Sequence, residues 1–211
     1  MGDTERKREL RPNAASFYIF LSKLIAVKVW LTSRFENSLC MSKIIHTWKR
    51  IKLVEETVTL PNAQSCQHTS IVHPGASVIL PIDSNGNIVL INQYRPSVRK
   101  WLLELPAGTI EPQESPQQCA QRELEEEAGY CANELISLGQ VTPMAGFCDE
   151  IQHFFIAKDL QESHRYACDD DEIIEVVTLS LTQIEQAIVD NTLTDAKTIA
   201  CISKAKLSGY I

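Results

Sequence analysis

Three glutamates on one predicted helix are the side chains best suited to chemistry in this sequence of 211 residues. Glu126 and Glu127 follow Glu123 by three and four positions, so all three project from one helix face. Carboxylate oxygens suit Mg²⁺, which keeps bound waters that a phosphate can replace. Arg122 precedes Glu126 by four positions and is expected to pair with it. The pattern predicts a divalent-cation site, although a glutamate run by itself is more often a solvated helix face.

The helix that carries these glutamates has clear predicted ends. Ser115 is a good N-cap, Pro116 suits the first helical position, and Gln118 completes a capping box. Gly129 is typical of the residue that ends a helix. The residues predicted to face the core recur at every fourth position: Ala120, Leu124 and Ala128.

The spacing of residues around this helix is more specific than the glutamates alone. Five residues separate Gly108 from Glu114, and seven more separate Glu114 from Arg122, which opens the run R-E-L-E-E-E-A-G-Y. This segment resembles the signature of the Nudix family, G-x5-E-x7-R-E-U-x-E-E-x-G-U, in which U is a bulky apolar residue. Every fixed position is filled, and the aromatic Tyr130 at the last position is the one loose fit.

The resemblance extends over residues 70–180 and is to the ADP-ribose pyrophosphatases and related nucleotide-sugar hydrolases. Four short segments, less specific than the Nudix signature, carry it: Gln93–Pro96, Glu104–Gly108, Gly146–Glu150 and Asp169–Val176. One position departs from that subfamily, because Ala145 stands where a proline is expected, and Pro143 lies two residues earlier.

The resemblance implies a Mg²⁺-dependent pyrophosphatase, with Mn²⁺ as a second candidate cation, that splits ADP-ribose into AMP and ribose 5-phosphate. Because of Ala145, another nucleoside diphosphate sugar such as GDP-mannose stays open as the substrate. A third hypothesis is that the protein is a Nudix-fold sensor, which binds a nucleotide without hydrolysing it. The intact glutamates favour an enzyme over the sensor.

Each residue that matches the family pattern has an expected role. The metal ligands are expected to be Glu123, Glu126, Glu127 and the backbone carbonyl of Ala107. The residues expected to contact substrate are Trp48, Arg95, Glu104, Gly108 and Thr109. The residues expected to support the motif structurally are Glu114, Arg122 and Gly129. Two of these residues have an alternative explanation without a substrate. Arg95 could be an ordinary surface residue. Trp48, like Trp101, could pack in the core or an interface instead of stacking on a base.

The water-activating carboxylate is expected in the acidic segment Asp169–Glu172. Glu127 is expected to be a further catalytic residue. An acidic run in an arbitrary protein is usually a solvated turn, but the resemblance implies that this one closes over the site. Glu172 matches the family best and Asp170 is the second choice.

The elements that must position these residues predict an α+β fold, an α/β/α sandwich. Apolar runs predict a hairpin from Ala76–Ile82 and Ile88–Tyr94, and further strands up to Ile173–Leu179. Two later helices are expected at Thr182–Val189 and Thr194–Leu207. With the resemblance, this becomes a Nudix fold whose mixed sheet lies between helices, preceded by a small N-terminal β region.

The expected domain organisation has three parts. Residues 1–40 are read as an N-terminal extension, either dispensable or the product of a misassigned start, with a targeting role as the alternative. Residues 41–72 form the β region, which the resemblance makes a homodimerisation element that light scattering would test. Residues 73–211 form the Nudix hydrolase domain.

Charge and cysteine content exclude some classes of partner. Residues 1–40 carry a charge of +3 and the rest of the chain −10, which argues against a nucleic-acid surface. The apolar run Phe17–Leu31 is too short and too interrupted by lysine to predict a membrane span. Seven scattered cysteines without a C-x-x-C pair indicate reduced thiols and a cytoplasmic protein. The partner that the resemblance implies is a nucleoside diphosphate sugar.

Overall fold

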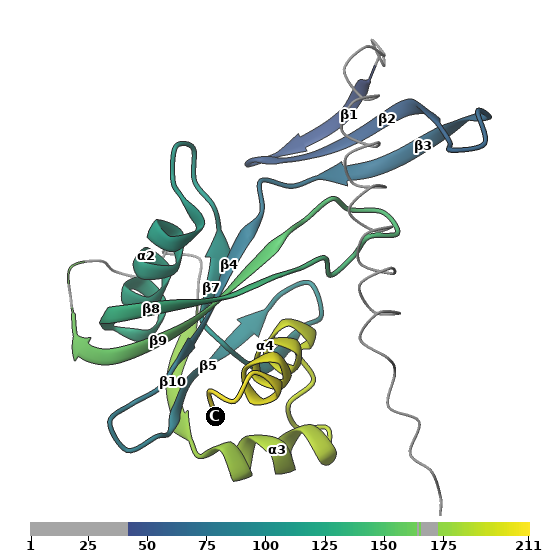
Figure 1. Cartoon of the computed structure of the whole chain (residues 1–211). Coiled ribbons are helices and arrows are strands. Elements are labelled where there is room, and N and C mark those ends of the chain that lie inside the picture. Colours follow the sequence, from purple (N-terminus) through teal and green to yellow (C-terminus); the bar gives the residue numbers. More distant parts are fainter. Residues whose placement is uncertain (1–41, 164, 166–172) are drawn as a thin grey trace, which may run out of the picture. The chain divides into compact units, whose positions relative to one another are not determined.

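The computed structural model describes residues 42–163, 165 and 173–211. These residues form a mixed α+β fold of ten strands and three helices (Figure 1), which confirms the predicted fold class. The predictions for residues 1–40 and for Asp170 and Glu172 lie outside the described residues. Within the described part of the chain, no helix is long and apolar enough to cross a membrane.

The first three strands form a sheet of their own, in the order β1–β2–β3. They are β1 (Lys43–Trp48), β2 (Ile51–Thr59) and β3 (Ser65–Val72), and both pairings are antiparallel. Most of their side chains are exposed, and Val54 is the one fully buried residue of these three described strands. The predicted N-terminal β region is confirmed, whereas its role in dimerisation stays a prediction.

A mixed four-stranded sheet lies at the centre of the remaining chain. Its order is β7 (Ala107–Thr109), β4 (Ala76–Pro81), β9 (Gln152–Glu162) and β8 (Tyr130–Val141). Strands β4 and β9 run parallel, and the other two pairings are antiparallel. A second, antiparallel sheet has the order β10 (Ile174–Leu179), β5 (Ile88–Arg95) and β6 (Lys100–Glu104).

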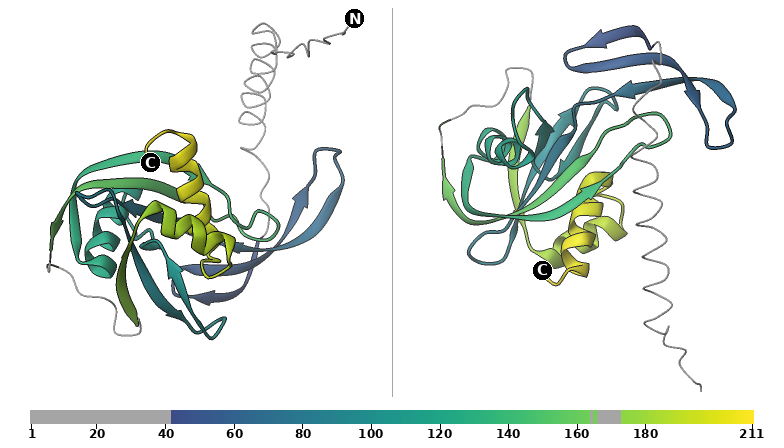
Figure 2. Two further views of the ribbon diagram at one scale, coloured as in Figure 1. Left: turned by 90° about the horizontal axis from the view of Figure 1, so that it is seen from below. Right: turned by 45° about the horizontal axis from the view of Figure 1, so that its top comes forward.

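Helices cover both faces of these sheets (Figure 1, Figure 2). Val78 and Leu80 of β4 pack into a core with residues of α3 (Leu181–Val189) and α4 (Ala196–Leu207). Ile79 points to the other face, where Leu124 of helix α2 (Pro116–Ala128) is fully buried. Alternate β4 side chains therefore join two hydrophobic cores, as expected for a strand buried on both faces.

The predicted hairpin between β4 and β5 is wrong. Each strand belongs to a different sheet, and a single bridge between Ile82 and Ile88 joins them. The Asp83 carboxylate accepts hydrogen bonds from the backbone of Asn85 and Asn87, so the predicted turn does form. Both strands are buried almost throughout, and each finds its partners in distant segments instead of across the turn.

Helix α2 has the predicted ends. The Ser115 side chain accepts from the backbone of Gln118, whose side chain accepts in return from the Ser115 backbone, at 3.2 and 2.9 Å. Gly129 adopts a left-handed conformation with φ 73°, which favours glycine as the residue that ends the helix. Both ends of α2 are therefore defined by residues close to them in the sequence.

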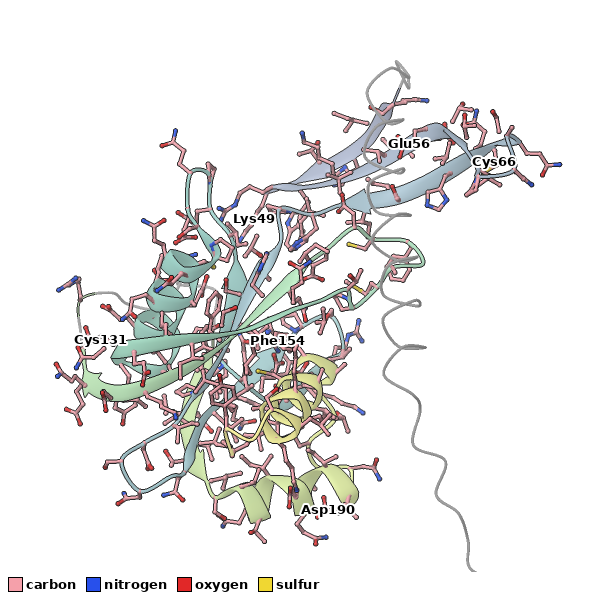
Figure 3. All side chains as sticks on the ribbon, viewed as in Figure 1. Lys49, Glu56, Cys66, Cys131, Phe154 and Asp190 are labelled. Atoms are coloured by element: carbon pink, nitrogen blue, oxygen red, sulfur yellow. The ribbon has the colours of Figure 1, made fainter. Side chains whose placement is uncertain are left out.

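The described cysteines are all free thiols: Cys66, Cys119, Cys131, Cys148 and Cys201. Burial raises the pKa of Cys119 and of Cys201 to about 12. Both thiols therefore stay protonated at neutral pH and are poor nucleophiles. Cys66, in contrast, is exposed on β3, away from the fully buried Phe154 (Figure 3).

Candidate active site

The glutamate-bearing face of α2 lies directly against strand β7. The backbone N–H of Ala107 donates to Oε2 of Glu127 at 2.7 Å, and Glu127 is almost fully buried. The carboxylate of Glu123 packs onto the Cα of Gly108. A Cβ at position 108 would meet all three carboxylate atoms of Glu123 at distances that real Cβ atoms do not show. The first glycine of the Nudix signature therefore makes room for one of the predicted metal ligands.

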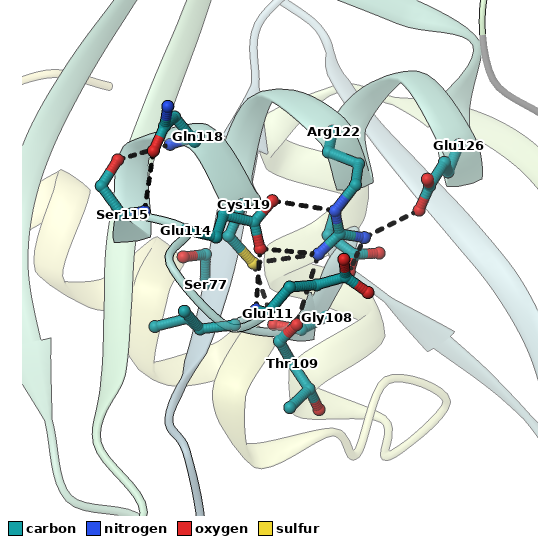
Figure 4. A network of polar contacts seen from close by, with 12 residues as sticks. Ser77, Gly108, Thr109, Glu111, Glu114, Ser115, Gln118, Cys119, Arg122 and Glu126 are labelled. Carbon is teal, nitrogen blue, oxygen red and sulfur yellow. Dashed lines mark hydrogen bonds and ion pairs between the residues drawn. The ribbon is translucent and has the colours of Figure 1, made fainter. Parts of the chain in front are cut away.

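Arg122 organises the acidic residues around it. Its Nε and Nη2 donate to the two oxygens of Glu114 at 2.9 and 3.0 Å, and its Nη1 donates to Glu123 at 2.6 Å and Glu126 at 2.8 Å. Nη2 also donates to the Thr109 carbonyl at 3.3 Å. Figure 4 shows this guanidinium between the loop before α2 and the glutamate face of the helix.

These contacts shift the pKa values of the paired groups. Burial alone would lower the pKa of Arg122, but hydrogen bonds to Glu114 and the charge of Glu123 outweigh it and raise that pKa. Burial alone would raise the pKa of Glu114, but the hydrogen bond from Arg122 holds it below its ordinary value. Both groups are therefore charged at neutral pH. Glu114 also accepts from the Glu111 backbone at 2.9 Å, which fits its predicted structural role.

Arg95 approaches the same site from strand β5. Its Nε and Nη2 donate to the two oxygens of Glu104 at 2.9 and 2.7 Å. The side chain of Glu104 is 1% exposed and that of Arg95 is 34% exposed. The hydrogen bond to Glu104 raises the pKa of Arg95 against the opposing effect of burial. Glu104 thus lies behind Arg95, and the structure gives it a protein partner where we predicted a substrate contact.

A cavity of about 320 Å³ opens between these elements, a volume typical of small-molecule sites. Seven predicted residues line it: Trp48, Arg95, Ala107, Gly108, Thr109, Glu123 and Glu126. Arg122, for which we expected a structural role with substrate binding as the alternative, also lines it. Glu104 and Glu127 are not among the lining residues. Trp101 also lies outside the lining and packs edge-on against Tyr94, with ring centroids 5.8 Å apart.

Sequence reasoning missed one wall of the cavity. The turn between β1 and β2 contributes Lys49 and Arg50, the start of β2 contributes Ile51, and the loop before α2 contributes Glu111. Arg50 joins the two segments, because it donates to the Ile110 carbonyl at 3.3 Å and to Glu111 at 3.1 Å. Lys49 occupies the turn with φ 49° (Figure 3). No spacing in the sequence points to these residues, since they lie about sixty positions from the segment they meet.

The side chains on the glutamate face of α2 have the ligand atoms that a divalent cation requires. Glu123, Glu126 and Glu127 supply carboxylate oxygens, and Gly108 leaves the space in which Glu123 lies. In the described part of the chain, however, no three His, Cys, Asp or Glu side chains are already gathered as a metal-binding group. In this structure Glu123 and Glu126 both accept hydrogen bonds from Arg122. The residues fit a divalent cation whose contacts with the Glu123 and Glu126 carboxylates would replace their hydrogen bonds to Arg122.

Comparison with known proteins identifies the family of the chain. The profile of the NUDIX domain matches residues 72–200. The ADP-ribose pyrophosphatase of Bacillus subtilis is 35% identical over 164 residues, covering 77% of this chain and 89% of the relative. The methanol dehydrogenase activator of Bacillus methanolicus is 34% identical over 174 residues, covering 82% and 94%. The chain therefore belongs to the Nudix hydrolase family.

Two further similarities are one to the sequence of a relative with another substrate in its name and one to a solved structure. A GDP-mannose pyrophosphatase of Yersinia enterocolitica is 35% identical over 147 residues, covering 65% of this chain and 75% of the relative. The crystal structure of an ADP compounds hydrolase has a TM-score of 0.68 at 18% identity, covering 83% of this chain and all of that one. That structure shows the shared fold alone.

We expect the buried Glu104 carboxylate to make stability depend on pH. Burial alone would raise its pKa, but the hydrogen bond from Arg95 and the charge of Lys197 lower it below the ordinary value of 4.5. A carboxyl with a lowered folded pKa stabilises the protein fully above its ordinary pKa, and this contribution is lost as pH falls through the folded pKa. Urea unfolding should therefore show stability falling below about pH 4.5.

The variant Glu104→Gln isolates this contribution. It should lose about 1.5–3 kcal/mol of stability at pH 7, because two cations lose their anionic partner. Its stability should also change less than that of the unmodified protein as pH falls from 5 to 3. The exposed Glu134 gives a matched control, since Glu134→Gln removes one carboxylate without touching the buried pairs. Equal acid dependence in the Glu104 variant and the unmodified protein would contradict the assignment.

Proposed function

We propose that this protein is a Mg²⁺-dependent ADP-ribose pyrophosphatase, which releases AMP and ribose 5-phosphate. The observation that carries the proposal is the pairing of charges around one cavity. Glu123 and Glu126 line one side, and Arg95, Lys49 and Arg50 add cationic groups to the lining. A diphosphate bound with a divalent cation needs both kinds of partner.

The chain's own residues divide the work of binding and hydrolysis. Glu123, Glu126, Glu127 and the Ala107 carbonyl would hold Mg²⁺, or Mn²⁺ in its place. The bound cation supplies neutralisation of the charge that builds up on the diphosphate oxygens. Arg95 donates to those oxygens, Gly108 and Thr109 contact the diphosphate on the β7 side, and Trp48 offers an exposed ring to the base.

Hydrolysis needs a carboxylate that takes a proton from the attacking water. The water oxygen forms a bond to one phosphorus, the bridging P–O bond breaks, and the two phosphate products leave with the bridging oxygen on one of them. We propose Glu172 for the proton acceptor, with Asp170 as the alternative. Both residues lie outside the described part of the chain, so this assignment rests on the family resemblance.

ADP-ribose is preferred as the substrate on the likeness to the Bacillus subtilis relative. GDP-mannose is the second candidate, because a GDP-mannose pyrophosphatase is similarly identical and Ala145 replaces the subfamily proline. We also propose a homodimer through residues 41–72, which the exposed Ile44 and Ile45 of β1 support. Free thiols support our proposal of a cytoplasmic location.

A panel of diphosphate compounds tests the substrate. ADP-ribose, GDP-mannose and inorganic pyrophosphate would each be incubated with the protein and Mg²⁺, and released mononucleotide or phosphate measured by chromatography. We expect the highest kcat/KM for ADP-ribose, and loss of all turnover when EDTA removes the cation. Faster release of GMP from GDP-mannose would overturn the ADP-ribose assignment. Tight binding of ADP-ribose without turnover of any compound would identify a sensor instead.

A further inference from the structure

A buried carboxylate connects the cavity to the helix on the far side of the core. The side chain of Glu104 is 1% exposed, yet it has two cationic partners. Arg95 donates to both of its oxygens, and Nζ of Lys197 donates to Oε2. Lys197 belongs to the first turn of α4, which the family signature does not include.

The first turn of α4 is held firmly against this carboxylate. Asp195 is the N-cap, and its Oδ2 accepts from Lys197 Nζ, from the Thr198 backbone and from the Thr198 hydroxyl at 3.0, 3.0 and 2.6 Å. The Thr198 hydroxyl oxygen in turn accepts from the backbone N–H of Leu105 at 2.8 Å. The strand end at Glu104 and Leu105 is therefore joined to α4 by a side-chain and a backbone contact.

The result is a row of alternating charges: Arg95, Glu104, Lys197 and Asp195. Arg95, at one end, lines the cavity and its side chain is one-third exposed. A guanidinium has five N–H donors, and the bonds to Glu104 use two of them. The remaining donors are available to a substrate, in an orientation that Glu104 determines. The orientation of Glu104 is determined in turn by Lys197.

We propose that Lys197 is a positioning residue for the diphosphate: through Glu104 it holds the guanidinium of Arg95 toward the cavity. Asp195 assists by holding Lys197. The inference rests on the proposed function, because it requires Arg95 to contact an anionic substrate.

The direction in which loss of Lys197 changes substrate binding can be predicted. The row is neutral when all four groups are charged, and it becomes net negative when the lysine is replaced by a neutral residue. An extra negative charge close to an anionic substrate disfavours binding. The Glu104 carboxylate also loses one of the two donors that fix its position, so the guanidinium of Arg95 is less restrained. Substrate binding should weaken more than the chemical step.

The experiment compares Lys197→Met with Lys206→Met in the full-length protein. Lys206 lies on the same helix and pairs with the exposed Glu185, away from the cavity, so it is a matched control. We expect Lys197→Met to raise KM for ADP-ribose with Mg²⁺ by about tenfold, while kcat changes far less. Lys206→Met should leave both constants unchanged. Lys197→Gln keeps a hydrogen-bond donor without the charge, serves if the Met variant does not fold, and should raise KM in the same direction.

A double-mutant cycle separates positioning from simple structural support. If Lys197 acts through Arg95, Lys197→Met should raise KM clearly less in an Arg95→Met background, where only the effect of the lost charge remains, than in the unmodified protein. The same increase in both backgrounds would overturn the inference, as would an unchanged KM in both single variants of Lys197. These outcomes require an active parent enzyme. If the unmodified protein turns over no compound of the diphosphate panel, the proposed function fails first and this inference fails with it.

Discussion

Replacing Glu127 by Gln is expected to lower kcat/KM by about 10²-fold or more while leaving the fold intact. The change removes one anionic ligand from the divalent cation, and a correctly held cation contributes several kcal/mol of charge stabilisation in the transition state. The fold should survive because the amide oxygen of glutamine can still accept from the Ala107 backbone, the contact that Glu127 makes at 2.7 Å. Steady-state kinetics with Mg²⁺, together with thermal unfolding, measure both parts of the prediction.

The same acidic run offers a matched control for this variant. Glu125 is as buried as Glu127, but its carboxylate accepts from the Ser163 hydroxyl at 3.0 Å instead of from the backbone of β7. Glu125→Gln should therefore keep near-normal kcat/KM. Near-normal rates in Glu127→Gln, or an equal loss in both variants, would refute the assignment of Glu127 as a specific metal ligand.

A single methyl group at position 108 is expected to be almost as damaging. In Gly108→Ala the new Cβ would overlap the carboxylate of Glu123, so that side chain must turn away. The overlap involves the end of a flexible side chain and no backbone atom, which means that the protein can fold with Glu123 displaced. We expect a fall in kcat/KM of about 10²-fold, a weaker apparent affinity for Mg²⁺ in titrations of activity, and little change in thermal stability.

Gly146→Ala separates this effect from the general cost of replacing a glycine. A Cβ at position 146 would have nothing within 4 Å, and its backbone does not adopt the left-handed conformation. This variant should keep the activity and Mg²⁺ affinity of the unmodified protein. An active Gly108→Ala with unchanged Mg²⁺ affinity would show that the Glu123 carboxylate need not lie where the structure places it.

Local sequence rules predicted the glutamate-bearing helix α2 well. The capping box at Ser115 and the left-handed Gly129 depend on residues within one helical turn of each other, so they can be read without the fold. The same rules placed Leu124 in the core and the glutamates together on another face. The pairing of Arg122 with Glu126 at 2.8 Å follows from their spacing of four residues on the helix.

Strand pairing was predicted less well, because the partners are distant. The short turn between β4 and β5 favoured a hairpin, yet β4 pairs with β9 over seventy residues later. Both strands are apolar on each face, and such runs do not identify a neighbour. β4 and β5 are each buried in a different sheet, and the packing of those sheets determined which strands pair.

The sequence by itself determined the family and the helix that carries the glutamates. Each depends on identities and spacings along a continuous stretch of twenty-three residues, from Gly108 to Tyr130. Only the tertiary structure decided that Glu104 lies behind Arg95, that Lys197 holds it from α4, and that Lys49 and Arg50 close the cavity. The reason is physical: these contacts form between segments that the packing of sheets and helices brings together, and no local spacing records them.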